Sequence, residues 1–153
     1  MKIEFIITGN QEDATGNTIP KIKKTRASYW TPEAQRYAKW KEFVQHAFGV
    51  ALANHLINNP QDQGTINHGS GVVGKATPKP IDLKADQHAC MDIKIYWKNK
   101  AHADSENCFG SIADALFVQD RNLDGSFTGE VSADGKGRVE VSILIDEASK
   151  ISR

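Results

Sequence analysis

Acidic side chains are concentrated in one short stretch of the chain, residues 103–120, which reads ADSENCFGSIADALFVQD. Its carboxylates belong to Asp104, Glu106, Asp114 and Asp120. Carboxylates that lie together repel one another unless a cation neutralises them, and oxygen ligands suit a hard divalent ion such as Mg²⁺. The stretch, in which Asn107 adds a polar amide, is therefore a candidate Mg²⁺ site.

A short helix is expected to carry these acids. Apolar residues recur at spacings of three and four, which predicts one buried stripe. The stripe consists of Phe109, Ile112, Ala113 and Leu116. Asp104 and Ser105 stand where the N-cap of such a helix belongs, and acids are favoured at a helix start whatever else they do. The spacing alone leaves two explanations open, a helix cap and a metal site.

The same stretch resembles the signature of the RusA family of Holliday-junction resolvases, D-x-D-N-x-x-K-x-x-x-D-A-L followed by a further aspartate. The matching positions are Asp104, Asn107, Asp114, Ala115, Leu116 and Asp120. Glu106 replaces the second aspartate of the signature and keeps its charge. Gly110 stands where the family carries its catalytic lysine, so cleavage is the property that this resemblance leaves open.

The resemblance implies a Mg²⁺-dependent endodeoxyribonuclease that resolves four-way (Holliday) DNA junctions in recombination and repair. On this hypothesis Asp104, Glu106 and Asp120 are catalytic and bind Mg²⁺. Asn107 and Asp114 support them. The implied partners are branched DNA and a second copy of the chain, in a homodimer. Two alternatives stay open: a RusA-like protein that binds junctions without cleaving them, and a structural domain without a DNA role.

A basic segment with neighbouring aromatic residues precedes Thr31. Its cations are Lys21, Lys23, Lys24 and Arg26, and Tyr29 and Trp30 follow them. Such a composition suits a phosphate backbone and stacked bases, although a solvated loop can have it too. RusA-like proteins are characterised by a basic G-x-x-x-P-K-like segment before T-P, an outline followed here by Gly16, Pro20, Lys21, Thr31, Pro32 and Tyr37. We therefore expect this segment to bind DNA.

Lys98 and Lys100 are further candidates for DNA binding, because they come directly before the acidic stretch. Either of them is also a candidate to supply the cation that Gly110 lacks.

The remaining patterns predict the framework. Thr31-Pro32 is a strong helix start, and the apolar spacing extends that helix to about Asn58. Alternating residues predict strands at 88–97 and 138–145. β-Branched and aromatic residues predict a strand at 2–8, and a further strand is expected at 127–131. We expect one RusA-like domain over 1–153 of the α/β (α+β) class. It would have a mixed β-sheet closed by the last strand, one long and one short helix, and a long flexible loop at about 59–87.

Two motif fragments do not predict sites. Residues 69–75 copy most of a P-loop, but Ala76 occupies its Ser/Thr position and Pro78 prevents the helix that must follow. No nucleotide cofactor is expected. Residues 120–125 begin like a calcium loop, but Val131 stands where the bidentate glutamate belongs.

Composition narrows the class of protein. With 153 residues, 39% hydrophobic and 25% charged, the chain has the make-up of an ordinary globular domain. Its formal net charge is zero, which disfavours a DNA-binding role unless the positive charge is segregated. The two cysteines form no C-x-x-C pair, and no signal peptide or long apolar run is present. We expect a cytoplasmic protein without a membrane partner.

Overall fold

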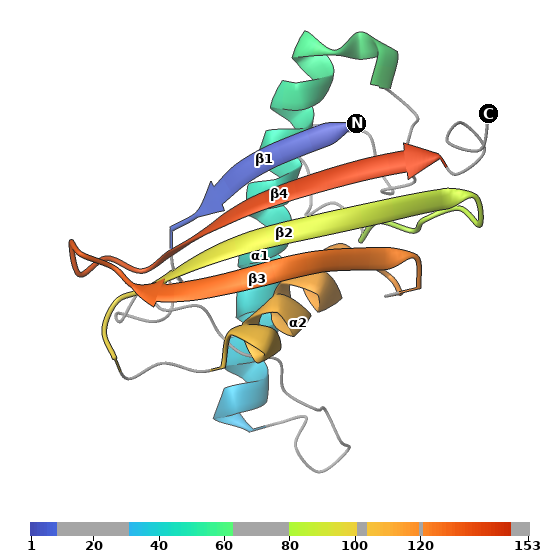
Figure 1. The fold of residues 1–153 in the computed structure, drawn as a ribbon. Coiled ribbons are helices and arrows are strands. Elements are labelled where there is room, and N and C mark those ends of the chain that lie inside the picture. The colour runs from blue at the N-terminus through green and yellow to red at the C-terminus, as the bar shows by residue number, and fades with distance from the viewer. Residues whose placement is uncertain (9–30, 63–79, 101–103, 120, 148–153) are drawn as a thin grey trace.

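The structure is a computed structural model that describes residues 1–8, 31–62, 80–100, 104–119 and 121–147. Its strands are β1 (Lys2–Ile7), β2 (Gln87–Trp97), β3 (Leu123–Val131) and β4 (Arg138–Glu147). Its α-helices are α1 (Pro32–Asn58) and α2 (Ser105–Leu116). Both helices cover the same face of one four-stranded sheet (Figure 1). The expected class, a mixed sheet packed with one long and one short helix, is confirmed.

The strand order is β1-β4-β2-β3. β4 is antiparallel to both β1 and β2, whereas β2 and β3 are parallel and are joined through α2. The prediction that the last strand closes the sheet is therefore wrong, because β4 lies in the middle. Its inward residues are Val139, Val141, Ile143 and Ile145, and all are buried. A strand with neighbours on both sides is the one best placed to bury such a row.

The short connection between β3 and β4 does not join neighbouring strands, because β2 lies between them. The connection passes the end of β2, where the Ser132 amide donates to the Trp97 carbonyl over 2.7 Å. Asp134 then accepts hydrogen bonds from the Ser132 hydroxyl and the Lys136 amide. These two donors hold the pKa of Asp134 below its ordinary value.

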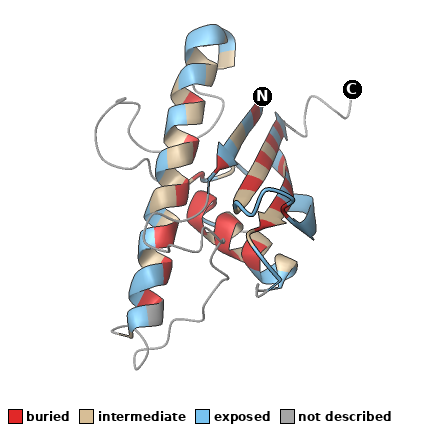
Figure 2. Cartoon of the chain, turned by 90° about the vertical axis from the view of Figure 1, so that its left-hand side faces the viewer, coloured by how far each residue is buried: buried red, intermediate tan, exposed pale blue. Residues whose placement is uncertain are grey.

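Helix α1 begins as its sequence predicts. The Thr31 hydroxyl caps it by accepting from the Ala34 amide over 3.2 Å, and Pro32 opens the first turn. One side of the helix is buried against the sheet (Figure 2). That side carries Tyr37, Trp40, Val44, Phe48 and Leu52. Ala47, Ala51 and Leu56 are only half-buried and pack around this buried side.

The predicted loop at 59–87 contains ordered structure at both ends. Pro60–Asp62 forms a short 3-10 helix, and β2 begins at Gln87. Ile81 is buried and forms a single bridge with Phe117, just after α2. The P-loop-like run lies outside the described residues. No helix in the described ranges is long and apolar enough to cross a membrane.

Candidate functional site at the start of α2

Helix α2 begins at the carboxyl ends of the parallel strands β2 and β3, whose last residues, Trp97 and Val131, are register partners. In open sheets with parallel strands, this edge is where ligands bind. Asp104 caps the helix by accepting from the Glu106 amide over 2.8 Å, while its carbonyl accepts from Cys108 over 3.1 Å. The predicted helix and its cap are confirmed.

Gly129 on β3 sets how closely α2 approaches the sheet. A Cβ built on Gly129 would lie 2.5 Å from the Ser105 hydroxyl oxygen and 3.0 Å from Nε1 of Trp97. The first of these distances is shorter than real Cβ atoms tolerate. The missing side chain thus lets the first residue of α2 lie directly against the strand, which fixes the position of the helix start.

Asp104, Glu106 and Asn107 are all exposed on this first turn. One oxygen of Asp104 is occupied by the cap, which leaves its second oxygen and the Glu106 carboxylate available to a cation. Mg²⁺ commonly binds through one or two protein carboxylates and completes its six ligands with water and substrate phosphate. The two carboxylates therefore fit Mg²⁺ that arrives together with a phosphate.

Asp114 lies near the other end of α2, roughly 15 Å from Asp104 along the helix axis at 1.5 Å per residue. It accepts from the Tyr37 hydroxyl over 2.8 Å and pairs with the Lys41 ammonium at 3.1 Å. Burial of Tyr37, followed by the hydrogen bond and charge of Asp114, raises the pKa of this phenol. These contacts join Asp114 to α1, so it does not act as a ligand to an ion at Asp104.

Two further contacts fasten α1 to α2. The indole of Trp40 donates to the Ser111 hydroxyl over 3.1 Å, and that hydroxyl donates to the Cys108 carbonyl over 2.9 Å. The Gln45 amide donates to the Ala115 carbonyl over 2.9 Å. Helix α2 is therefore positioned from two sides, by the sheet at Gly129 and by α1 along its length.

The predicted DNA-binding residues divide into two groups. Lys98, half-buried, and Lys100, exposed, lie in the loop that leaves β2 at the edge where α2 begins. Lys21, Lys23, Lys24 and Arg26 lie outside the described residues. β1, which precedes them, ends at the same edge, because Ile7 and Ile95 both pair with Val139.

Asp120 also lies outside the described part of the chain. Its neighbours Gln119 and Arg121 are joined by a 3.1 Å hydrogen bond. Both follow the end of α2 and precede β3, at the end of the helix opposite to Asp104. Within the ranges that the structure covers, no three His, Cys, Asp or Glu side chains come together to hold a metal. The three-carboxylate ligand set stays a prediction.

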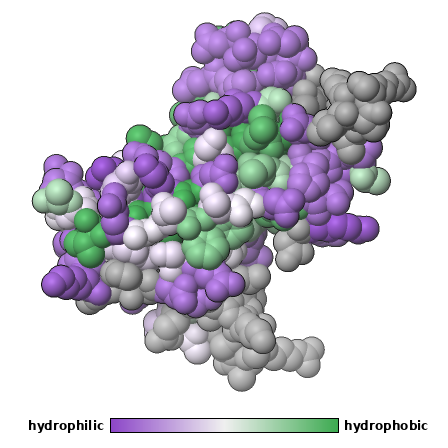
Figure 3. All heavy atoms as spheres, viewed as in Figure 1, coloured by the Kyte–Doolittle hydropathy of each residue, from purple (hydrophilic) through white to green (hydrophobic). Residues whose placement is uncertain are grey.

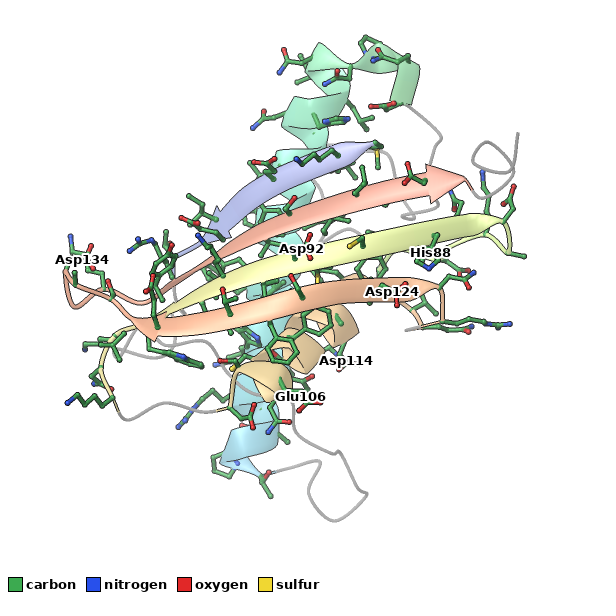
Figure 4. All side chains as sticks on the ribbon, viewed as in Figure 1. His88, Asp92, Glu106, Asp114, Asp124 and Asp134 are labelled. Atoms are coloured by element: carbon green, nitrogen blue, oxygen red, sulfur yellow. The ribbon has the colours of Figure 1, made fainter. Side chains whose placement is uncertain are left out.

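The other face of the sheet is covered by neither α1 nor α2, and most of its side chains are polar, with Ile6 and Leu144 as exposed exceptions (Figures 1 and 3). His88 pairs with Asp124 at 3.1 Å, and Asp92 accepts from the Ser126 hydroxyl over 2.7 Å (Figure 4). Burial and the charge of Asp92 raise the pKa of Cys90 between them, which keeps this thiol protonated. Acids outnumber lysine and arginine on the described strands of this face, which makes it a poor surface for DNA.

Sequence reasoning missed the cluster of Tyr37, Lys41 and Asp114. From the sequence, Tyr37 is expected only as part of the T-P outline and Asp114 only as a support for the metal ligands, so the contact between them is not foreseen. The available signal was a tyrosine followed four positions later by a lysine on the same helix.

Comparison of the sequence with protein-family models finds no match, and comparison with curated proteins finds none.

Proposed function

We propose that this protein is a RusA-like, Mg²⁺-dependent endodeoxyribonuclease that cuts four-way DNA junctions, with the start of α2 as its active site. The observation that carries the proposal is the pair of exposed carboxylates, Asp104 and Glu106, on the first turn of α2. They lie at the carboxyl edge of β2 and β3, directly after the loop with Lys98 and Lys100. Cations and carboxylates in one place suit a phosphate that is bound together with a metal ion.

In this proposal each residue type has a separate task. Bound Mg²⁺ would activate water and stabilise charge on the scissile phosphate. Asp104 and Glu106 hold the ion. The helix N-terminus and the two loop lysines attract the phosphate backbone, and Asn107 orients the groups around the site. Gly129 and the contacts with α1 keep the first turn of α2 in place.

A second candidate function is junction binding without cleavage. Gly110 favours it, because this position on α2 brings no cation to the site. Lys41, the cation that α1 contributes beside α2, is already paired with Asp114. The described residues also provide only two carboxylates at the first turn. Two carboxylates can hold a single Mg²⁺ ion. The second candidate therefore shares the site of the first and differs from it only in that the DNA is not cleaved.

One experiment separates the two candidates. A labelled synthetic four-way junction and a linear duplex of the same sequence are incubated with the protein in Mg²⁺ or in EDTA, and both binding and nicks are scored. The nuclease proposal expects paired nicks in the junction that require Mg²⁺, with the duplex left intact. Junction binding without nicks in Mg²⁺ would support the second candidate. Equal, weak binding to both DNAs without nicks would contradict both.

A further inference from the structure

Helix α1 extends beyond β1, an edge strand of the sheet (Figures 1 and 2). Leu52 is the last buried residue on the side of the helix that faces the sheet, and the helix continues to Asn58. The stretch between these two residues is roughly 9 Å long at 1.5 Å per residue, about twice the spacing of neighbouring strands. The helix is therefore long enough to support a further strand beside β1.

A groove lies in the corner between β1 and this part of α1. Its volume is about 630 Å³, which is within the usual range for ligand sites. Every residue of β1 contributes to one wall, and the other wall is a row of side chains on α1. The row consists of Phe43, Ala47, Val50, Ala51 and Asn54. An occupant of the groove meets the whole length of a strand on one side and mostly apolar side chains on the other.

The backbone of β1 shows what kind of occupant fits. Met1 and Ile145 exchange two backbone hydrogen bonds, at 3.1 and 2.8 Å. In an antiparallel pair, such residues alternate with residues whose amide and carbonyl point away from the partner strand. Those of Lys2, Glu4 and Ile6 therefore point away from β4, and in the described part of the chain no strand pairs with them. Donors and acceptors that alternate along an open edge fit the backbone of an extended chain.

The side chains of β1 define the sequence of such a chain. Lys2 and Glu4 form an ion pair at 3.2 Å on the face of the sheet opposite to α1, so they do not cover the apolar wall. A chain added antiparallel to β1 would place its own residues opposite them on that same face. Opposite charges in facing positions stabilise a pair, which favours an acid opposite Lys2 and a base opposite Glu4. The residues between these would face Val50 and its apolar neighbours on α1.

We propose that the groove between β1 and α1 binds an extended segment of another protein, which adds to the sheet antiparallel to β1. The segment has apolar side chains toward α1 and, on the other face, a base opposite Glu4 and an acid opposite Lys2. This inference does not rest on the nuclease activity. The start of α2 lies against β3, at the other edge of the sheet, so the bound segment would leave the candidate active site accessible.

Two synthetic peptides of identical composition test the proposal. In the matching peptide, SVTVKVES, the lysine is opposite Glu4 and the glutamate opposite Lys2 when the chain runs antiparallel to β1. The control peptide, SVTVEVKS, places like charges opposite each other in the same register. Fluorescence anisotropy with labelled peptides at low salt should show that the matching peptide binds about ten-fold more tightly, because two facing charge pairs change from attractive to repulsive.

Amide hydrogen exchange followed by NMR locates the bound peptide. The amides of Lys2, Glu4 and Ile6 should exchange at least ten-fold more slowly when the matching peptide is bound, because each gains a partner on the open side of β1. The amides of Ile3 and Phe5 should not change, because they are already bonded to β4.

A pair of variants on α1 tests the apolar wall. Val50→Lys replaces a groove residue that is 51% exposed and should weaken binding of the matching peptide about ten-fold, since a charged group then faces its apolar side chains. Ile57→Lys is the matched control. Ile57 is 73% exposed on the same helix and does not line the groove, so its replacement should leave the affinity unchanged.

Several outcomes would overturn the proposal. Equal affinity of the two peptides, or no binding of either at millimolar concentration, would exclude a sequence-selective strand site. Binding that does not slow exchange at Lys2, Glu4 and Ile6 would place the peptide elsewhere. Slow exchange of these three amides in the free protein would mean that the chain itself or a second copy already covers the edge. An affinity that Val50→Lys leaves unchanged would exclude α1 as a wall of the site.

Discussion

The hydroxyl of Tyr37 in α1 donates a 2.8 Å hydrogen bond to the carboxylate of Asp114 in α2, across 77 positions of the sequence. Lys41 lies beside both, 3.1 Å from the carboxylate and 5.6 Å from the centre of the tyrosine ring. The cluster fixes the crossing of the two helices. The end of α2 that carries Asp104 and Glu106 is therefore held by contacts made further along the same helix.

Replacing Tyr37 by phenylalanine tests the strength of this crossing. The variant keeps the buried ring and removes the donor to Asp114, so the free energy of unfolding should fall by about 1.5–3 kcal/mol, the usual range for a hydrogen bond to a charged group. Urea unfolding at neutral pH measures the change. A loss well below this range would mean that Lys41 alone satisfies Asp114.

The wild type and Tyr37→Phe should also differ in how their free energy of unfolding changes at alkaline pH. The pKa of Tyr37 is raised in the folded protein by burial and by Asp114, whereas in the unfolded chain it is roughly 10. The folded state therefore favours the protonated phenol, and this contribution is complete below pH about 10 and is lost as the pH rises above it. The stability advantage of the wild type over Tyr37→Phe should narrow above that pH. An advantage independent of pH would contradict the raised pKa.

Gly129→Ala tests how the sheet positions α2. The added methyl group would lie 2.5 Å from the Ser105 hydroxyl oxygen and 3.0 Å from the Trp97 indole nitrogen. The helix start has to move, and we expect a loss of about 1–3 kcal/mol in the free energy of unfolding, as for other overpacked sites. Junction cleavage should fall as well, because Asp104 and Glu106 move with the helix.

Ser105→Ala provides the matched control. It removes the closest atom and leaves the Ser105 Cβ at 3.7 Å from the added methyl group. The double variant Gly129→Ala with Ser105→Ala should recover part of the lost stability, although the contact with Trp97 remains. If the two losses simply add, the hydroxyl of Ser105 is not the group that Gly129 accommodates.

The helices and most strand positions were predictable because their signals are local. The Thr31-Pro32 start of α1 and the Asp104 cap of α2 are both observed. The alternation of β2 correctly separates inward from outward residues. The position of β4 was not predictable in this way, since strand order depends on which distant strands pair. A short connection containing Asp134 and Gly135 looks the same whether it joins neighbours or passes a third strand.

The candidate site was predictable only in part, for a related reason. The helix period shows which residues of α2 face the sheet, but it does not show where α1 lies. Asp114 is not part of the apolar stripe of α2, and the structure shows that it meets Tyr37 and Lys41 of α1. No sequence pattern marks Gly129. Its role is to leave room on β3 for the side chain of Ser105 on α2, and a contact between two distant elements is not visible in the sequence.

Neutralising Lys98 and Lys100 together tests whether the loop before α2 binds phosphate. Replacing both with glutamine should weaken junction binding and lower the slope of log K against log salt by up to about two, at roughly one unit for each phosphate that is no longer neutralised. Lys94→Gln is the matched control. This lysine is exposed on the open face of the sheet, away from the start of α2, so the slope should not change. An effect of Lys94→Gln half as large as that of the double change, in proportion to the charge removed, would mean that only net charge matters.

The most direct test of the active site is junction cleavage by Asp104→Asn. Asparagine caps a helix about as well as aspartate, so the unfolding free energy should change by less than about 0.5 kcal/mol while one carboxylate is lost from the proposed Mg²⁺ site. The rate of Mg²⁺-dependent nicking of a four-way junction should fall by orders of magnitude, with junction binding retained. A wild type that cuts in Mg²⁺ together with an Asp104→Asn variant that cuts equally fast would contradict the assignment of the start of α2 as the active site.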